Sequence, residues 1–469
     1  MADVVIIGGG ISGLATAFAV EREARKQGLD ISTLILEKGT RPGGKIWSRK
    51  EDGYLCEWGP NGFLDSKPWT LDLCRDTSIT ARLLRSNDNA RKRFIFSQGR
   101  LHQLPDSAQA FFSSGLISWP GKLRLSCELL IPPRRDGHDE TLADFARRRL
   151  GAEALEKLIG PMVSGVFAGD PETMSLKSCF PRIHELETEY GGLIKALFKL
   201  QKKRRLEKKS GKPVAGPSGP GGVLTSFYGG IDELISGVAG ALTGEIRTQA
   251  RVTGLRKEID GFEIDLEGGR ILQAVAVVSA CPAYELAAMV EKMDREMARI
   301  LNRIPYAPLS VVCCGFARGK IPHDLNGFGY LAVRGEKMNA LGTLWDSSIF
   351  PNRAPQGCVL LRSMVGGATR PEVMEWSEEK VQTKVLEDLR TSMGIDRKPD
   401  FIRVYPHEKA IPQYLSGHGK LIDGLADRAR YSPGFFFTGN AFFGVGLNDC
   451  VKAANETAAK VVDFIGHLR

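Results

Sequence analysis

The sequence predicts a mixed α/β fold in which a Rossmann-like nucleotide-binding domain is interleaved with an antiparallel-sheet substrate domain and a helical domain. Three observations predict it. A glycine-rich strand, turn and helix pattern opens the chain, helical apolar spacing occupies residues 105–210, and short β-type runs recur in the second half. With 469 residues, 42% of them hydrophobic, the chain is long enough for two or three domains with sizeable cores.

The first element is a βαβ unit. A strand at 4–7 leads into a glycine-rich turn, a helix follows, and a second strand at 33–36 ends at Glu37. The glycines allow a tight bend, close approach of a pyrophosphate and close helix packing, while free N–H groups at the helix start attract phosphate. Glu37 is placed to accept hydrogen bonds from a ribose. The predicted cofactor contacts of this unit are Gly8, Gly9, Gly10, Ile11, Ser12, Gly13 and Glu37.

A glycine-hinged loop follows Glu37 and leads to a turn at 57–62. This arrangement resembles the FAD-binding amine oxidase and desaturase superfamily, in which a double-glycine loop lies along the flavin side of FAD. An ordinary loop with positive φ at the two glycines is the alternative. The expected FAD contacts here are Lys38, Arg41, Gly43, Gly44, Lys45, Gly59, Pro60, Asn61 and Gly62.

The far end of the chain is expected to complete the same site. A short buried-type strand at 435–438 is followed by a glycine-rich turn and a final helix. The start of that helix offers N–H groups and a positive dipole end to the flavin pyrimidine, which gathers negative charge on reduction. No covalent attachment motif appears, so FAD is predicted to bind noncovalently. The expected contacts are Gly439, Asn440, Val445, Gly446 and Leu447.

Composition argues against a membrane-spanning protein and against a metal site. No apolar run approaches the roughly 20 residues of a membrane-spanning helix. The nine cysteines show neither CxxC pairs nor metal-ligand spacing with the seven histidines, which indicates reduced thiols in the cytoplasm and no metal site. Because the nucleotide-binding pattern starts at residue 3, we expect a bacterial-type chain without a targeting peptide.

Much of the formal charge of +9 lies in one basic run at 199–212, which passes into a Pro/Gly-rich link at 213–222. Nucleic-acid binding is not expected, because no supporting module accompanies the run. The run is either a solvated helix end or, together with apolar residues at 111–133, a peripheral attachment to an anionic membrane surface. Those apolar residues could equally form part of a core.

The predicted elements divide among three interleaved domains. Residues 1–84, 222–300 and 405–469 form the nucleotide-binding domain, 85–104 and 301–404 the substrate domain, and 105–221 the helical domain. The predicted elements are a hairpin at 93–104, helices at 142–150, 152–159, 193–205, 232–242 and 378–393, and strands at 246–255, 262–266, 271–279, 311–316, 327–333, 341–345 and 359–365.

Motifs along essentially the whole chain resemble the protoporphyrinogen oxidase family. They are GVFAGDPETMSL at 165–176, GFGYL at 327–331, LGTLW at 341–345, MVGG at 364–367 and IPQY at 411–414. The resemblance implies that Arg93 binds a substrate propionate and that the backbone of Val252 binds FAD. It also implies an apolar sandwich around a tetrapyrrole substrate, formed by Leu331, Leu344 and Met364 with Asn61 close by.

These implied roles make physical sense, because a flat tetrapyrrole with carboxylates needs apolar faces and a cation at its edge. A surface salt bridge is the alternative role for Arg93, and core packing is the alternative for the three apolar residues. One departure is Lys92, at a position that is asparagine in some relatives. It puts an amide contact from that position in doubt.

The implied reaction is the oxygen-dependent, six-electron oxidation of protoporphyrinogen IX to protoporphyrin IX in haem biosynthesis. Hydride would pass from a meso carbon to flavin N5, and molecular oxygen would reoxidise the flavin with release of hydrogen peroxide. No catalytic acid or base is assigned, since the protein mainly positions the substrate. A homodimer and a transient handover of product to a chelatase are the remaining expected associations.

Other functions remain open at this point. Coproporphyrinogen III oxidases share these motifs, and Arg318, Lys320 and Lys337 could serve the extra carboxylates of their substrate. A flavin-dependent amine oxidase is a further alternative within enzymes. A flavin-free binding protein resembling GDP-dissociation inhibitors comes from a different class, although the glycine sets at both ends of the chain argue against it.

Overall fold

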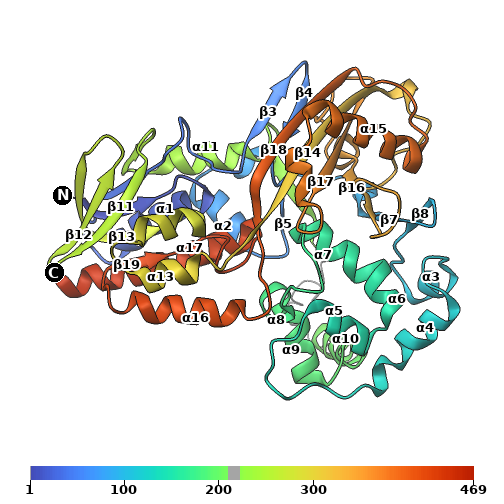
Figure 1. Ribbon diagram of the computed structural model, residues 1–469, viewed down its shortest axis with the longest axis horizontal. Helices are drawn as coiled ribbons and strands as arrows, with labels where there is room; N and C mark the ends of the chain where they lie inside the picture. The colour runs from blue at the N-terminus through green and yellow to red at the C-terminus, as the bar shows by residue number, and fades with distance from the viewer. Residues whose placement is uncertain (1, 210–221) are drawn as a thin grey trace.

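The computed structural model of the chain describes residues 2–209 and 222–469, and Figure 1 shows its arrangement. A seven-stranded sheet forms the centre of the first domain, with strand order β10-β2-β1-β13-β12-β11 and with β19 paired to β13. Strands from both ends and from the middle of the chain therefore build one sheet. They are β1 Ala2–Ile7, β2 Thr33–Leu36, β10 Glu245–Arg247, β11 Val252–Glu258, β12 Gly261–Leu266, β13 Ile271–Ser279 and β19 Phe435–Phe437.

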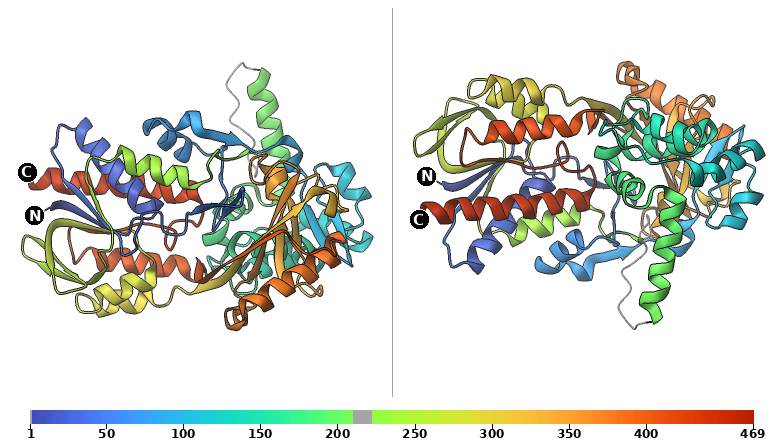
Figure 2. Two further views of the ribbon diagram at one scale, coloured as in Figure 1. Left: turned by 90° about the horizontal axis from the view of Figure 1, so that it is seen from above. Right: turned by 90° about the horizontal axis from the view of Figure 1, so that it is seen from below.

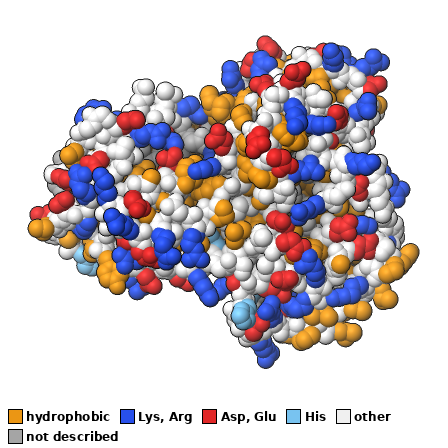
Figure 3. All heavy atoms as spheres, viewed as in Figure 1, with side chains coloured by type: hydrophobic (Ala, Val, Ile, Leu, Met, Phe, Trp, Pro, Cys, Tyr) orange, Lys and Arg blue, Asp and Glu red, His pale blue; other side chains and the backbone are white. Residues whose placement is uncertain are grey.

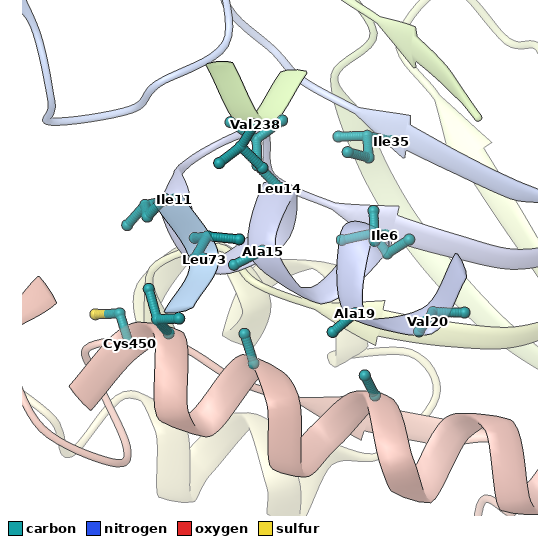
Figure 4. Close-up of a cluster of buried hydrophobic side chains, with 14 of the residues drawn as sticks. Ile6, Ile11, Leu14, Ala15, Ala19, Val20, Ile35, Leu73, Val238 and Cys450 are labelled. Atoms are coloured by element: carbon teal, nitrogen blue, oxygen red, sulfur yellow. The ribbon is translucent and has the colours of Figure 1, made fainter. Parts of the chain in front are cut away.

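Helices cover both faces of this sheet. One face carries α1 (Ile11–Lys26), α2 (Trp69–Asp76), α11 (Asp232–Ala241) and α17 (Leu447–Leu468). The other carries α12 (Ala283–Val290), α13 (Arg295–Leu301) and α16 (His418–Ala429). Figure 4 shows Ala15 and Ala19 of α1 facing α17, where small side chains let two helices pack closely. The first and last helices of the chain thus share one core.

A second seven-stranded sheet, with strand order β18-β14-β17-β16-β15-β7-β8, forms the second domain. Neighbouring strands are antiparallel except β15 and β7, which are parallel. Helix α15 (Glu378–Met393) packs on one face. The strands are β7 Phe94–Ser97, β8 Arg100–Gln103, β14 Tyr306–Ala317, β15 Gly329–Ala332, β16 Ala340–Leu344, β17 Cys358–Gly366 and β18 Phe401–Pro412.

A helical domain lies beside the second sheet, and its last helix projects away from the rest of the molecule (Figure 2). A buried ion pair between Arg149 and Glu128 links its parts, because the Glu128 carboxylate also accepts the N–H groups of Leu193 and Ile194 at the start of α10. The helices are α3 Ala108–Ser113, α4 Trp119–Ser126, α5 Leu142–Arg149, α6 Ala152–Ala154, α7 Gly160–Phe167, α8 Leu176–Cys179, α9 Pro181–Tyr190 and α10 Leu193–Lys209.

Short elements connect these domains. A hairpin of β3 (Ser48–Glu51) and β4 (Tyr54–Glu57) packs on the second sheet, and α14 (Asp346–Ile349) precedes β17. A small sheet joins β5 Phe63–Leu64, β9 Leu224–Phe227 and β6 Leu83–Arg85. Within the described residues, no helix has both the length and the apolar character needed to cross a membrane.

The predicted fold class is confirmed, and three details differ from the predicted elements. The strand expected at 246–255 is two strands, because β10 pairs with β2 at one edge of the first sheet and β11 pairs with β12 at the other. The helix expected at 152–159 ends in a π-helical turn at 155–159, just before Pro161, which has no N–H to continue an α-helical ladder. The domain boundary expected at 404/405 falls inside β18.

Candidate active site

The start of α1 forms a cradle made of backbone. Gly8 adopts φ +105°, and a Cβ on Gly13 would lie 1.9 Å from the carbonyl oxygen of Gly8. Gly10 caps the helix without any side-chain hydrogen bond, and no atom of the described residues lies within 4 Å of where its side chain would be. The first N–H groups of the helix therefore face open space, which is the arrangement that binds a pyrophosphate.

Glu37 lies directly after β2 and beside this cradle. Its carboxylate accepts the N–H groups of Gly9, at 2.8 Å, and Gly39, at 2.7 Å. Each oxygen keeps a further acceptor direction, so the group can also bind ribose hydroxyls. The Glu37 carbonyl accepts the N–H of Ala250, which lies two residues before the buried Val252 at the start of β11.

The double-glycine loop lies against the cradle. Gly43 and Gly44 adopt φ of +123° and +59°, and the N–H of Gly43 donates to the Gly9 carbonyl at 2.8 Å. A Cβ on Gly59 would lie 2.6 Å from the Lys45 carbonyl oxygen, so the turn at 59–62 packs directly on the loop. Any larger residue at these positions would push the segments apart.

A second helix start completes this side of the site. Gly446 caps α17 without a side-chain hydrogen bond, and the missing side chain of Gly439 would lie 3.7 Å from the Ser12 hydroxyl oxygen. Behind this turn, the Tyr414 hydroxyl donates to the Asn440 carbonyl and accepts the Gly444 N–H at 2.8 Å. Two uncapped helix starts, a ribose-binding acid and an extended loop between them fit a dinucleotide with the length of FAD.

Three of the cations expected near the cofactor turn toward protein groups instead. Lys38 pairs with Glu285 at 2.6 Å, and Arg41 pairs with Asp232 and lies 4.8 Å from the centre of the Trp47 ring. The ammonium of Lys45 donates to the carbonyls of residues 409 and 410, and burial lowers the pKa of Lys45 to about 8. A cofactor contact from these positions would therefore come from their backbone.

The four substrate-binding residues expected on the second sheet share one face. Leu331 pairs with Gly342, Gly342 pairs with Met364, and Leu344 lies opposite both Gly329 and Arg362. Paired residues on neighbouring strands point to the same face, and alternation keeps Leu331, Leu344 and Met364 together. Ile95 of β7 pairs with Leu331, so Arg93, two residues earlier, belongs to that face as well.

The environment of Arg93 suits the binding of an anion. Its guanidinium lies 5.2 Å from the centre of the Phe328 ring, and the side chain forms no ion pair with any carboxylate in the described part of the chain. Surrounding protein atoms lower the pKa of Arg93, because they displace the water that would solvate its charge. Helix α7 covers the same face, since a Cβ on Gly165 would lie 2.8 Å from a methyl carbon of Leu331.

A buried cluster of charges beneath this face was not expected from the sequence. The guanidinium of Arg362 lies 2.9 Å from the Asp346 carboxylate and donates to the carbonyls of Glu57 and Gly59. The Glu57 carboxylate pairs in turn with Arg353 at 3.3 Å. Strand alternation could have identified Arg362, which lies two residues before Met364. Nothing local to the sequence marks Asp346 as its partner.

The described ranges 2–209 and 222–469 contain no group of three or more histidine, cysteine or acidic side chains able to hold a metal ion. All nine cysteines are free thiols. The arrangement combines a dinucleotide cradle with a facing wall of apolar side chains and, at its edge, the Arg93 guanidinium, which is unpaired within the described residues. Such a site can hold a flat, apolar anion against the reacting part of a bound flavin.

Comparisons with known proteins agree with this geometry. The model of the family described as flavin containing amine oxidoreductase matches residues 11–462. Protoporphyrinogen oxidase 1, chloroplastic, of Spinacia oleracea is 32% identical over 99% of this chain and 84% of its own length. Coproporphyrinogen III oxidase of Bacillus subtilis (strain 168) is 30% identical over 98% of each chain. A crystal structure from Exiguobacterium sp. 255-15 superposes with a TM-score of 0.82 at 25% identity, covering 98% of each chain.

Proposed function

The chain belongs to the flavin containing amine oxidoreductase family and has FAD as its cofactor, and from this premise we propose that it oxidises protoporphyrinogen IX to protoporphyrin IX. The acceptor in this proposal is molecular oxygen, with hydrogen peroxide as the second product. The observation that carries it is Arg93, which has no ion-pair partner in the described part of the chain and lies on the same sheet face as Leu331, Leu344 and Met364. One guanidinium beside an apolar face fits a flat macrocycle that carries propionates along one edge.

Each part of the site has a role in this reaction. Arg93 holds a propionate and so fixes which meso carbon faces the cofactor. The wall residues orient the ring, and α7 excludes water from it. When bound, FAD supplies the hydride acceptor. The uncapped start of α17 places partial positive charge where a reduced flavin gathers negative charge.

A coproporphyrinogen would bring extra carboxylates, and two of the cations expected to serve them are engaged elsewhere. Arg318 donates to the Ile321 and Asp324 carbonyls, and Lys320 pairs with Asp400 at the far end of β14. Lys337 is exposed. The described side chains therefore favour a substrate with few carboxylates, although the Bacillus subtilis relative acts, by its name, on coproporphyrinogen III.

The decisive experiment is side-by-side turnover of protoporphyrinogen and coproporphyrinogen by the purified holoenzyme, with peroxide measured in the same samples. We expect faster turnover of protoporphyrinogen, with one peroxide formed for each pair of electrons removed. Faster turnover of coproporphyrinogen would reverse the choice of substrate. Protein that is colourless and takes up no FAD would remove the oxidase proposal.

We also propose that the helical domain attaches the protein to an anionic membrane surface. Figure 3 shows hydrophobic side chains gathered at the lower right edge of the molecule, over the helical domain. Trp119 and Leu130 are 70% and 80% exposed, whereas Leu116 and Ile117 of the same stretch are buried. Exposed Leu197 and Phe198 lie near the start of the basic run, whose later side chains lie outside the described residues.

A further inference from the structure

Tyr414 closes the turn that leads from β19 into α17. Its hydroxyl donates to the Asn440 carbonyl at 2.5 Å and accepts the Gly444 N–H at 2.8 Å. These two backbone groups lie four residues apart, and Gly444 adopts φ +118°, a conformation that L side chains rarely adopt. One buried side chain therefore bridges both ends of the turn that precedes the uncapped start of α17.

Tyr414 is itself held by the helical domain. Its carbonyl accepts the N–H of Ser175 at 2.9 Å, and the centres of its ring and that of Phe167, at the end of α7, are 6.1 Å apart. The side-chain amide of the preceding Gln413 donates to the Phe167 carbonyl at 2.8 Å. Val445, in the turn, packs on the same apolar cluster. The anchor of the turn thus lies outside the sheet that contains β19.

The Tyr414 hydroxyl can serve both partners at once because it keeps its proton. Burial raises the pKa of Tyr414 well above its usual value. A protonated phenol donates one hydrogen bond and accepts others. Phenylalanine would fill the same space but would leave the Asn440 carbonyl and the Gly444 N–H without this partner. The turn could then adopt other conformations, in which water satisfies these two groups.

We infer that Tyr414 is a positioning residue for the cofactor, which fixes the turn at 440–446 in the conformation that binds the flavin end of FAD before FAD arrives. The inference depends on FAD and not on which substrate is oxidised. A binding conformation that is populated only in part weakens the apparent affinity in proportion to its population. Because reduced flavin gathers negative charge, its affinity depends on the position of the α17 start more than the affinity of oxidised flavin does.

Tyr330 offers a matched control. It is also a buried tyrosine, and its hydroxyl bonds to those of Thr343 and Ser392, at 3.2 and 2.9 Å. Its side chain packs in the core beneath α15, on the face of the second sheet opposite to that of Leu331. Tyr330→Phe therefore removes a buried hydroxyl with two partners and leaves the cofactor turn unchanged.

The test compares wild-type, Tyr414→Phe and Tyr330→Phe holoenzymes. The Kd of FAD is measured by equilibrium dilution, from the fluorescence of released FAD, the reduction potential of bound flavin by equilibration with a dye, and stability by urea denaturation. Tyr414→Phe should raise the Kd about 5- to 30-fold, the range for one to two net hydrogen bonds. It should also make the reduction potential more negative. Tyr330→Phe should lower stability and change neither cofactor property.

Three results would overturn the inference. They are an unchanged Kd in Tyr414→Phe, an equal rise of the Kd in Tyr330→Phe, and weaker binding of FAD with an unchanged reduction potential, which indicates a merely structural role. A further measurement needs no variant and follows hydrogen exchange of the segment 440–446 in the wild type, with FAD bound and after its removal. The segment should stay protected without FAD. Rapid exchange there would show that FAD, and not Tyr414, orders the turn.

Discussion

The cofactor side and the substrate side of the site use different parts of the polypeptide, the backbone on one side and side chains on the other. Apart from the Glu37 carboxylate, the cofactor side consists of backbone: glycines at the starts of α1 and α17 leave N–H groups and open space. The substrate side consists of side chains, which strand register brings to one face of the second sheet. A change on the first side should therefore remove the cofactor, whereas a change on the second should alter turnover and leave the cofactor bound.

The largest effect is expected from Gly13→Ala. The new Cβ would lie 1.9 Å from a backbone carbonyl oxygen, which cannot move aside without distorting the turn that faces the pyrophosphate. We expect flavin content to fall below about a tenth of the wild-type value, measured by absorbance of purified protein. Gly240→Ala in α11 is the control, because a Cβ there would have no neighbour within 4 Å among residues 2–209 and 222–469, and alanine favours a helix. Normal flavin content in Gly13→Ala would show that the backbone of this turn does not hold the cofactor.

Arg93→Ala should instead leave flavin content unchanged. It removes a charge-assisted interaction worth roughly 1.5 to 3 kcal/mol, which corresponds to a fall of about 10- to 150-fold in kcat/KM for protoporphyrinogen. Lysine should restore only part of the activity, since it lacks the planar fork. Arg91→Ala, which breaks an exposed pair with Asp88, is the control. Loss of flavin from Arg93→Ala would mean that the two sides are not separable.

The free energy of unfolding should depend on pH through His418, which lies beside the cofactor side of the site. This buried ring stacks on Tyr414, with 4.1 Å between ring centres, and burial lowers the pKa of His418 to about 4. The unfolded chain takes up a proton near pH 6.5, so the free energy of unfolding falls as pH drops from about 6.5 to 4, by roughly 3 kcal/mol at most. His418→Gln should lose this part of the pH dependence in urea denaturation at pH 7 and pH 5. If His418→Gln shows the same difference in free energy of unfolding between pH 7 and pH 5 as the wild type, His418 is not the source of the pH dependence.

The smallest expected effect is on membrane binding by the helical domain. This domain contributes α7 to the substrate side and is otherwise separate from the site. Binding to anionic vesicles should weaken as salt rises from 0.1 to 1 M, because the screening length shortens from about 10 to 3 Å. Sedimentation with neutral vesicles gives the apolar part of binding alone. Equal binding to both vesicle types at every salt concentration would leave no role for charge.

The cofactor side of the site could be predicted from the sequence more completely than the substrate side. The cradle at 8–13 and the start of α17 were predictable, because a glycine pattern after a strand acts within a few residues. The grouping of Leu331, Leu344 and Met364 came from resemblance, and the observed register places them together. The Asp346 and Arg362 pair could not be predicted, since it depends on how a loop folds back onto a strand. Likewise, β18 continues past the expected boundary because β14 pairs with it along most of its length.

The pairing of the first strand and helix with distant segments also sets an order for biosynthesis. β1 needs β13 at residues 271–279 as a neighbour, and α1 needs α17 at residues 447–468 to cover its apolar stripe. During synthesis, the opening βαβ unit is made long before residues 447–468, so its apolar surface stays uncovered until α17 has been made. Because the site uses the starts of both α1 and α17, we expect flavin to bind only after residues 447–468 have been made.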